Sequence, residues 1–425
     1  MSEIDLYQGF EHSYFDLSKD DASLFKSVLF NQEPDEKCLE LVNEQDVIKL
    51  KCNYYIGVDW IAQGKRAIFV SPKINTESQE TDFLKMLFSC MKHPDIAKYT
   101  NELYQIKSND PYIPINQKQD LITPLLIISY LNILKLIVRK GLKKSYYKVE
   151  KNLSSRIKGK VIVSKTLKEN VLKNKLTQTI CNYEEFGVNC LENKILKYAL
   201  KFAEKYLCTY PKFSSYLLPI INFCTPAFHE VDVLDVDVHS IKKVKTNKFF
   251  KEYKEALNLA EMILKRFGYN LKEIDKLTVR VPPFWIDMPK LFELYVLGLL
   301  KDRYGSKIQF QAKGNYGEPD FLLNAENEKI IIDTKYKRIY QGNESSKSRF
   351  NSDDIRQICG YARDKKILSK LGYETTELQN VLVDCLIIYP DQNASEELPL
   401  SIKQSEIEQF IQFYKMAIKL PTLSE

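Results

Sequence analysis

The sequence has only four histidines, and none of its nine cysteines forms a Cys-x-x-Cys pair, so the common ligand patterns of zinc and iron–sulfur sites are missing. No apolar run reaches the roughly 18–20 residues of a membrane-spanning helix, because the longest, residues 121–134, is interrupted by proline and polar side chains. The first residues lack the basic and apolar segments of a signal peptide. We therefore expect a cytoplasmic protein with reduced cysteines and no membrane partner.

Charge is distributed unevenly along the 425 residues. The chain has 62 Lys and Arg against 56 Asp and Glu, a formal net charge of +6. Residues 135–175 contain 14 basic and two acidic residues, a local charge of +12, which leaves −6 for the rest of the chain. Such a concentrated basic segment indicates a polyanionic partner, although the solvated face of a helix in a lysine-rich protein is the alternative.

Hydrophobic patterning divides the chain into three regions and predicts an α+β multidomain protein. Residues 1–120 are β-rich, and their β-branched and aromatic runs predict a hairpin over residues 53–70. Residues 121–245 show mostly helical spacing of apolar side chains and include the basic segment. Residues 246–425 change to helix, strand, strand, helix, strand, which predicts a compact α/β domain.

Two carboxylates and a lysine fall at the ends of adjoining predicted strands in the last region. Asp320 begins one apolar run, while Asp333 and Lys335 end the next one. Alternation along a strand places Asp333 and Lys335 on one face, which Asp320 can reach from the neighbouring strand. Mg²⁺ prefers carboxylate oxygens, and a lysine beside it can position or deprotonate water, or neutralise phosphate. The pattern therefore predicts a magnesium-dependent phosphodiesterase site with Asp320 and Asp333 as metal ligands.

Two predicted helices supply further candidates for this site. Glu293 is the single acid in an almost wholly apolar helical run, where an ionised carboxylate is costly unless it is paired or directed at a metal. We expect it to support the metal or its water, and an ion pair with Lys290 is the alternative. Gln357 and Tyr361 are four residues apart on a later helix, so they share one helix face.

These motifs resemble a known nuclease superfamily. A helical glutamate, Pro-Asp, a gap to Asp-x-Lys and then Gln-x-x-x-Tyr are similar to the PD-(D/E)xK superfamily in its Q-x-x-x-Y branch. Other segments resemble McrC, the nuclease subunit of McrBC modification-dependent restriction systems, and the similarity spans roughly residues 50–390. These segments are Tyr54-Tyr55-Ile56-Gly57-Val58, Ser71-Pro72-Lys73-Ile74, Arg139-Lys140-Gly141-Leu142, Arg156-Ile157-Lys158-Gly159-Lys160, Tyr183-Glu184-Glu185-Phe186 and Asn193-Lys194-Ile195-Leu196.

The resemblance implies that the C-terminal domain, of restriction-endonuclease type, cuts double-stranded, modified DNA with Mg²⁺. Gln357 and Tyr361 would orient the site or the DNA strand. An McrB-like AAA+ GTPase hexamer would drive the reaction, and the absence of a GxxxxGK[ST] loop here agrees with nucleotide binding in that partner. The N-terminal part of McrC docks in the motor ring, so the turn residues Gln63, Lys65 and Arg66 are expected to contact it, unless the hairpin is core scaffold.

Two questions stay open at the level of the sequence. The basic segment, represented by Lys143, Lys144 and Lys148, contacts either the DNA backbone or an acidic partner surface. The chain is either the nuclease of a defence system against foreign DNA, a stand-alone repair nuclease of the same superfamily, or a non-cutting subunit that assembles and activates the motor. The intact Asp320, Asp333 and Lys335 speak against a degenerate nuclease.

Overall fold

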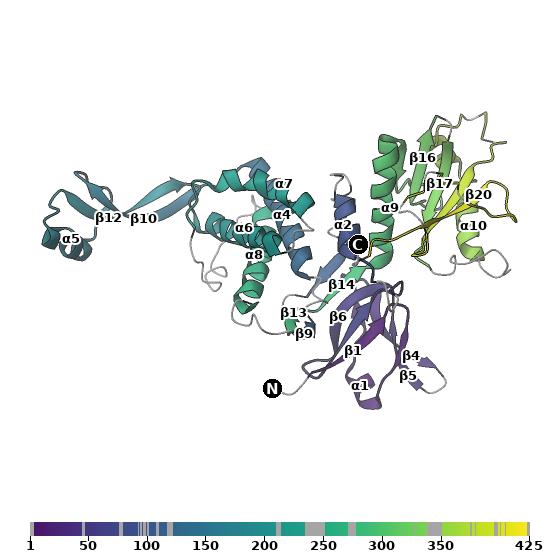
Figure 1. Ribbon diagram of the computed structural model, residues 1–425, viewed down its shortest axis with the longest axis horizontal. Helices are drawn as coiled ribbons and strands as arrows, with labels where there is room; N and C mark the ends of the chain where they lie inside the picture. Colours follow the sequence, from purple (N-terminus) through teal and green to yellow (C-terminus); the bar gives the residue numbers. More distant parts are fainter. Residues whose placement is uncertain are drawn as a thin grey trace. The chain divides into compact units, whose positions relative to one another are not determined.

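The fold of the chain is given by a computed structural model of residues 1–425 (Figure 1). The described residues are 4–422 except for 45–46, 76–79, 92, 94–95, 97–98, 100–101, 108–109, 117–121, 210–213, 234–250, 271–277, 327, 338–350, 375, 379, 395–397, 400 and 404. The chain forms two compact units, one made of Met1–Ile115 with Arg280–Glu425 and the other of Asn116–Val279. No helix in the described part of the chain is long and apolar enough to cross a membrane.

Two sheets that share an apolar core make up the N-terminal part of the first unit. One sheet has the strand order β1-β7-β6-β14-β8 and the other β2-β5-β4-β3. The buried side chains of Phe30, Leu50 and Trp285 lie in their common core. The elements are β1 (Asp5–Phe10), β2 (Tyr14–Asp16), α1 (Lys19–Leu24), β3 (Val28–Leu29), β4 (Lys37–Glu44), β5 (Val47–Cys52), β6 (Tyr55–Ala62), β7 (Arg66–Ser71), α2 (Phe83–Met91), β8 (Tyr104–Ile106) and β14 (Phe284–Asp287).

Strands β6 and β7 form the hairpin that the sequence predicts, but they lie inside the sheet. β7 pairs with β1 and β6 pairs with β14, so both strands have neighbours on each side. Gly57 has a positive φ of 150°, and a Cβ there would collide with the carbonyl oxygen of Phe284, so glycine permits the close pairing of β14. At the turn, Arg66 is ion-paired with Asp21, whereas Gln63 and Lys65 are exposed. The hairpin strands are therefore part of the core scaffold, the alternative that the sequence left open, while contact of the turn with a motor stays a prediction.

The N-terminal and C-terminal parts of the sequence are not separate domains, because they share a sheet and a helix pair. β14 comes from the C-terminal part and lies between β6 and β8. The following helix α9 (Met288–Tyr304) packs against α2. A boundary at residue 120 was predicted because local patterns cannot reveal that a strand beginning at Phe284 completes the N-terminal sheet.

The C-terminal part contains a six-stranded mixed sheet in the order β15-β16-β17-β18-β20-β19. Strands β15, β16 and β17 are antiparallel, whereas β17, β18 and β20 run parallel. Buried residues of α10 pack on the face that carries Leu322 and Ile331. The elements are β15 (Ile308–Phe310), β16 (Phe321–Ala325), β17 (Glu328–Thr334), α10 (Ser352–Tyr361), α11 (Lys365–Lys370), β18 (Asp384–Pro390), β19 (Ser405–Glu406) and β20 (Phe413–Ile418).

The second unit combines helices with a long antiparallel hairpin. Helix α8 packs against both α4 and α6, so its residues belong here and not to the nuclease region that was predicted to begin at residue 246. The amphipathic spacing of α8 is the same whichever unit it joins, so sequence alone could not assign it. The elements are α4 (Ile122–Lys140), β10 (Ser145–Ser154), β11 (Lys160–Val161), α5 (Val163–Glu169), β12 (Gln178–Gly187), α6 (Leu191–Thr209), α7 (Ser214–Cys224) and α8 (Lys251–Asn270), and short pairs elsewhere are β9 (Ile113–Asn116) and β13 (Thr278–Val281).

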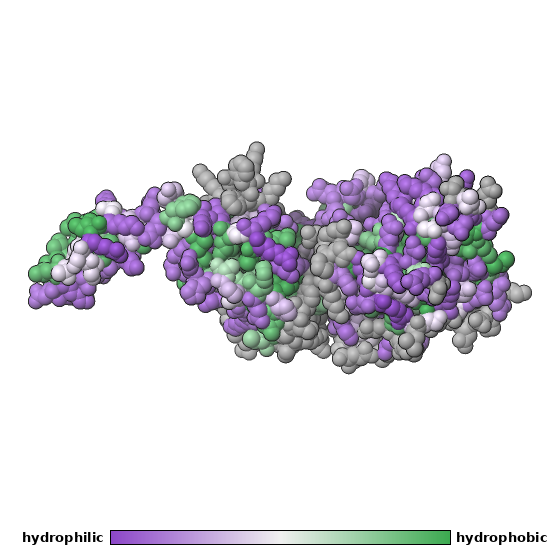
Figure 2. Space-filling view, turned by 90° about the horizontal axis from the view of Figure 1, so that it is seen from above, coloured by the Kyte–Doolittle hydropathy of each residue, from purple (hydrophilic) through white to green (hydrophobic). Residues whose placement is uncertain are grey.

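We call residues 145–187 the arm. In the arm β10 pairs with β12 over ten residues, and β11 and α5 lie in the connection between them. Most of the basic segment is therefore in the arm and is extended or irregular, where mostly helical structure was predicted. Large apolar side chains are exposed on it, and Figure 2 shows hydrophobic colour gathered at the arm's end, around α5.

Candidate active site

The hairpin of β16 and β17 brings Asp320 and Asp333 to the same end of the sheet, as predicted. Asp320 directly precedes β16, and Asp333 is the last residue but one of β17. Because Phe321 pairs with Ile332, the two aspartates lie opposite each other at the ends of neighbouring strands. Asp320 Oδ2 accepts hydrogen bonds from the backbone N of Thr334, at 2.6 Å, and from its Oγ1, at 2.5 Å. The two strands thus hold both carboxylates in a fixed relation.

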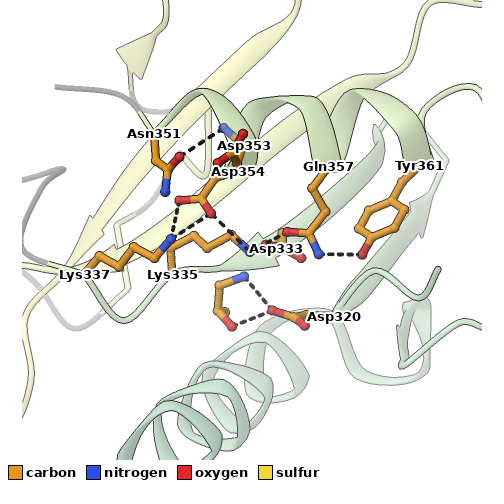
Figure 3. A network of polar contacts seen from close by, with 10 residues as sticks. Asp320, Asp333, Lys335, Lys337, Asn351, Asp353, Asp354, Gln357 and Tyr361 are labelled. Atoms are coloured by element: carbon orange, nitrogen blue, oxygen red, sulfur yellow. Dashed lines mark hydrogen bonds and ion pairs between the residues drawn. The ribbon is translucent and has the colours of Figure 1, made fainter. Parts of the chain in front are cut away.

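Lys335 connects this pair of carboxylates to helix α10 (Figure 3). Its Nζ is ion-paired with Asp333 and donates a hydrogen bond to Gln357 Oε1 at 2.9 Å. Gln357 Nε2 donates in turn to the hydroxyl oxygen of Tyr361 at 2.9 Å. The Gln-x-x-x-Tyr residues and the Asp-x-Lys residues therefore form one continuous polar network, and their predicted proximity is confirmed.

Glu293 lies on α9, where its Oε2 accepts from Lys290 Nζ at 2.9 Å and its Oε1 accepts from Gln311 Nε2 at 3.2 Å. The ion pair with Lys290 that was the alternative is present. Burial, and to a smaller extent the charge of the nearby Asp320, raises the pKa of Glu293 to about 7. The glutamate thus belongs to the electrostatic environment of the site as well as to its ion pair.

Burial and mutual repulsion act on the carboxylates of the site. Burial, followed by the charge of Asp320, raises the pKa of Asp333 to about 7. Burial also raises the pKa of Asp320, against the hydrogen bonds from Thr334. Burial lowers the pKa of Lys335, but the charges of Asp333 and Asp354 outweigh it and the pKa lies above its ordinary value. Lys335 is thus a charged donor among carboxylates that repel one another.

Two charged residues of this network were not singled out from the sequence. Asp354 is buried at the start of α10 and accepts from Lys337 Nζ at 2.8 and 2.9 Å, and it lies 3.9 Å from Lys335 Nζ. A signal for Asp354 was available, because it is four residues before Ile358 and seven before Tyr361, on the buried face of α10. Its neighbour in sequence, Asp353, is exposed.

The carboxylates of the site are suited to a magnesium ion, although no group of three or more His, Cys, Asp or Glu side chains in the described parts of the chain is already arranged around a metal position. Mg²⁺ is commonly held by one or two carboxylates, and waters and substrate phosphate oxygens complete its coordination. Asp320 and Asp333 offer such a pair, and a cation would offset the burial that raises both pKa values and the repulsion by Asp320 that further raises that of Asp333. The donor set therefore fits the predicted ion.

The predicted DNA-binding lysines lie in the other unit and differ from one another. Lys143 Nζ forms an ion pair with Glu192 at 2.6 Å, and its side chain is largely buried. Lys144 and Lys148 are exposed, on or beside β10. Lys143 is thus already engaged in an ion pair, which a count of basic residues could not show, because its partner is about 50 residues away in sequence.

A family model described as McrBC 5-methylcytosine restriction system component matches residues 50–371. Among solved structures, the refined half-complex from the tetradecameric assembly of Thermococcus gammatolerans McrB AAA+ hexamers with bound McrC matches at 15% identity and a TM-score of 0.40, covering 97% of this chain and 94% of that chain. The cryo-EM structure of the Thermococcus gammatolerans McrBC complex matches at 14% identity and a TM-score of 0.29, covering 72% of this chain and 89% of that chain. No curated protein matches the chain. The family match spans most of the sequence and confirms the resemblance drawn from its motifs, and the chain belongs to the family of McrBC 5-methylcytosine restriction system components.

Proposed function

We propose that the chain is the magnesium-dependent DNA endonuclease subunit of a McrBC-like restriction system in the cytoplasm, with a C-terminal PD-(D/E)xK domain. The observation that carries this proposal is the continuous network from Asp333 through Lys335 and Gln357 to Tyr361. Buried carboxylates and a buried lysine are costly to a fold unless the site uses them. Phosphodiester hydrolysis needs the combination present here, a metal-binding pair of carboxylates beside a cation.

In this proposal Asp320 and Asp333 hold Mg²⁺, which supplies charge stabilisation for the phosphate and an activated water when bound. Thr334 keeps the Asp320 carboxylate oriented through its two hydrogen bonds. Lys335, as a charged donor, positions the attacking water or the phosphate oxygen. Gln357 fixes the Lys335 ammonium group, and Tyr361 fixes the Gln357 amide, so these two residues orient the site.

The partner in this proposal is an McrB-like AAA+ GTPase, consistent with membership of a McrBC system. The arm is the surface that we expect this partner to cover, because contiguous exposed apolar side chains mark interaction sites. Basic side chains beside them suit an acidic protein surface, one of the two alternatives for the basic segment. The exposed apolar residues of the arm are Tyr146, Ile157, Val163, Leu167, Val171, Leu172, Leu176 and Phe186.

The proposal is tested by the Asp333→Ala variant, assayed with the McrB-like partner, nucleotide and Mg²⁺ on plasmid DNA that contains 5-methylcytosine. Asp353→Ala is the matched control, since it removes an exposed carboxylate only a helix turn from the site. We expect the control to cut normally and Asp333→Ala to cut at least about 100-fold more slowly.

The same assay separates the three candidate functions. Full cutting by Asp333→Ala would contradict the assigned site. Cutting by the wild-type chain without the partner would favour a stand-alone repair nuclease. A wild-type chain that accelerates hydrolysis by the motor but never cuts DNA would be an activator subunit.

A further inference from the structure

A buried ion pair from the N-terminal part of the chain reaches the strand that carries the proposed catalytic residues. Glu11 follows β1 and is only 2% exposed, and its Oε1 lies 3.5 Å from the Nζ of Lys73, which follows β7. The same Nζ donates a hydrogen bond to the backbone carbonyl oxygen of Tyr336 at 2.8 Å. Tyr336 is the residue directly after Lys335, so this contact joins regions 263 residues apart in sequence.

The Lys73 ammonium group is enclosed by aromatic rings as well. Its Nζ is 4.3 Å from the centre of the Tyr336 ring and 4.9 Å from that of Tyr54. The Tyr336 ring packs against Phe292, with 5.8 Å between ring centres, and Phe292 is the neighbour of Glu293 on α9. Lys73 thus contacts both the backbone carbonyl and the ring of Tyr336.

This attachment lies just beyond the end of β17, where the pairing with β18 (Asp384–Pro390) comes to an end. β17 ends at Thr334, and beyond it the backbone N of Lys335 donates to the carbonyl of Ile388 at 2.8 Å. The carbonyl oxygen of Lys335 accepts from the backbone N of Lys337 at 2.8 Å, and the following carbonyl, that of Tyr336, accepts from Lys73 Nζ. The contact from Lys73 is thus one of the bonds that fix the main chain beside Lys335, whose Nζ is in turn held by Asp333 and Gln357.

We propose that Lys73, anchored by the buried carboxylate of Glu11, is a positioning residue that holds the Asp333–Lys335 segment in its catalytic geometry. The inference rests on the proposed nuclease function. It gives the N-terminal part of the chain an indirect role in the chemistry, in which Lys73 acts through the backbone beside Lys335.

The chain offers a matched control for a purely structural ion pair. Lys107 Nζ lies 2.6 Å from Oδ2 of the buried Asp59, which also accepts from Trp285 Nε1 at 2.8 Å. Lys107 and Lys73 are both partly buried lysines of the N-terminal part, each paired with a buried carboxylate in the same unit. Only Lys73, of these two, is hydrogen-bonded to the strand segment that carries Lys335.

The experiment compares Lys73→Met, Lys73→Arg and Lys107→Met as full-length proteins with the McrB-like partner, Mg²⁺ and methylated plasmid. Single-turnover cleavage separates the rate constant, which reports the geometry of the site, from the amplitude, which reports the folded fraction. We expect Lys73→Met to lower the rate constant by about 10- to 100-fold, since a displacement near 1 Å can cost this much. Lys107→Met should keep the wild-type rate constant, and Lys73→Arg should regain part of the loss, because it retains the charge and a donor.

A second variant covers the case in which Lys73→Met does not fold. Glu11→Gln keeps the volume of the side chain and removes the anchoring charge, and we expect a smaller fall in rate constant at full amplitude. The proposal is overturned if Lys73→Met lowers the amplitude but not the rate constant, or if Glu11→Gln does so where Lys73→Met does not fold. It is also overturned if Lys107→Met lowers the rate constant as much as Lys73→Met does. Asp333→Ala tests the proposed nuclease site separately, because full cleavage by that variant would contradict the site whatever the result for Lys73.

Discussion

The end of the six-stranded sheet buries charged side chains, whereas the arm exposes large apolar ones. Around β17, charged groups are buried and paired with one another, as in the contacts of Lys335 with Asp333 and Gln357. In the arm, large apolar side chains face outward, and Leu172 and Leu176 are 80% and 75% exposed. Neither arrangement is favourable for an isolated chain, since buried charges lose hydration and exposed leucines retain ordered water.

The difference indicates two kinds of task. Buried carboxylates that lie close together favour the binding of a cation, which suits metal-dependent chemistry at the end of the sheet. Exposed apolar side chains on a two-stranded hairpin favour contact with another apolar surface, which suits binding to a partner protein. The lysines of the arm are partly engaged within it, as Lys158 is with Glu185 at 3.2 Å. The arm therefore carries less unpaired positive charge than its sequence indicates.

The largest effect that would sharpen this comparison is expected in the arm. The double change Leu172→Glu and Leu176→Glu should reduce partner-dependent cleavage by about 30-fold or more, because losing a central apolar contact commonly costs that much. Stability should hardly change, since both side chains are exposed. Leu218→Glu on α7, an exposed leucine of the same unit outside the arm, is the control. Equal stimulation of the motor by the double variant would contradict the assignment of the arm.

A smaller effect is expected for Asp354 at the sheet. Asp354→Asn keeps the shape of the side chain but removes the charge that lies 3.9 Å from Lys335 Nζ and pairs with Lys337. We expect the cleavage rate to fall by about 10-fold, as is typical for outer partners of a site, with DNA affinity retained. Asp353→Asn serves as its exposed neighbour for comparison. A wild-type cleavage rate for Asp354→Asn would show that Asp354 only forms an ion pair at the end of the helix.

The smallest effect concerns the salt dependence of DNA binding. If the arm contacts a protein, the changes Lys144→Glu and Lys148→Glu should leave the slope of log binding constant against log salt unaltered. If they neutralise DNA phosphates, the slope should fall by about 0.9 for each lysine. Lys143 is left in place, because its loss would leave Glu192 partly buried without its ion pair. A slope reduced by nearly two would assign this part of the arm to DNA.

Sequence patterns predicted much of the geometry of the candidate active site because its signals are local. Asp320 begins one apolar run and Asp333 ends the next, which predicts adjoining strands, and Gln357 and Tyr361 share a face through helix periodicity alone. Asp354 was overlooked, because an acid in the first turn of a helix is common and its burial depends on the sheet beneath it. The aromatic pair Tyr146 and Phe186, with ring centres 5.1 Å apart, was also not foreseen, since the register of β10 with β12 creates it.

The sequence by itself determined the family, the hairpin that carries the carboxylates, the β-rich N-terminal part and the concentration of basic residues. These depend on residue type and on spacings of a few positions, which local backbone geometry converts directly into structure. Only the tertiary structure decided that β14 completes the N-terminal sheet, that the basic segment lies mostly in an arm, and that Lys73 is bonded to the backbone of Tyr336. Such pairings are chosen by the burial of whole sheets and helices, and residues far apart in sequence carry no local sign of the partner they will meet.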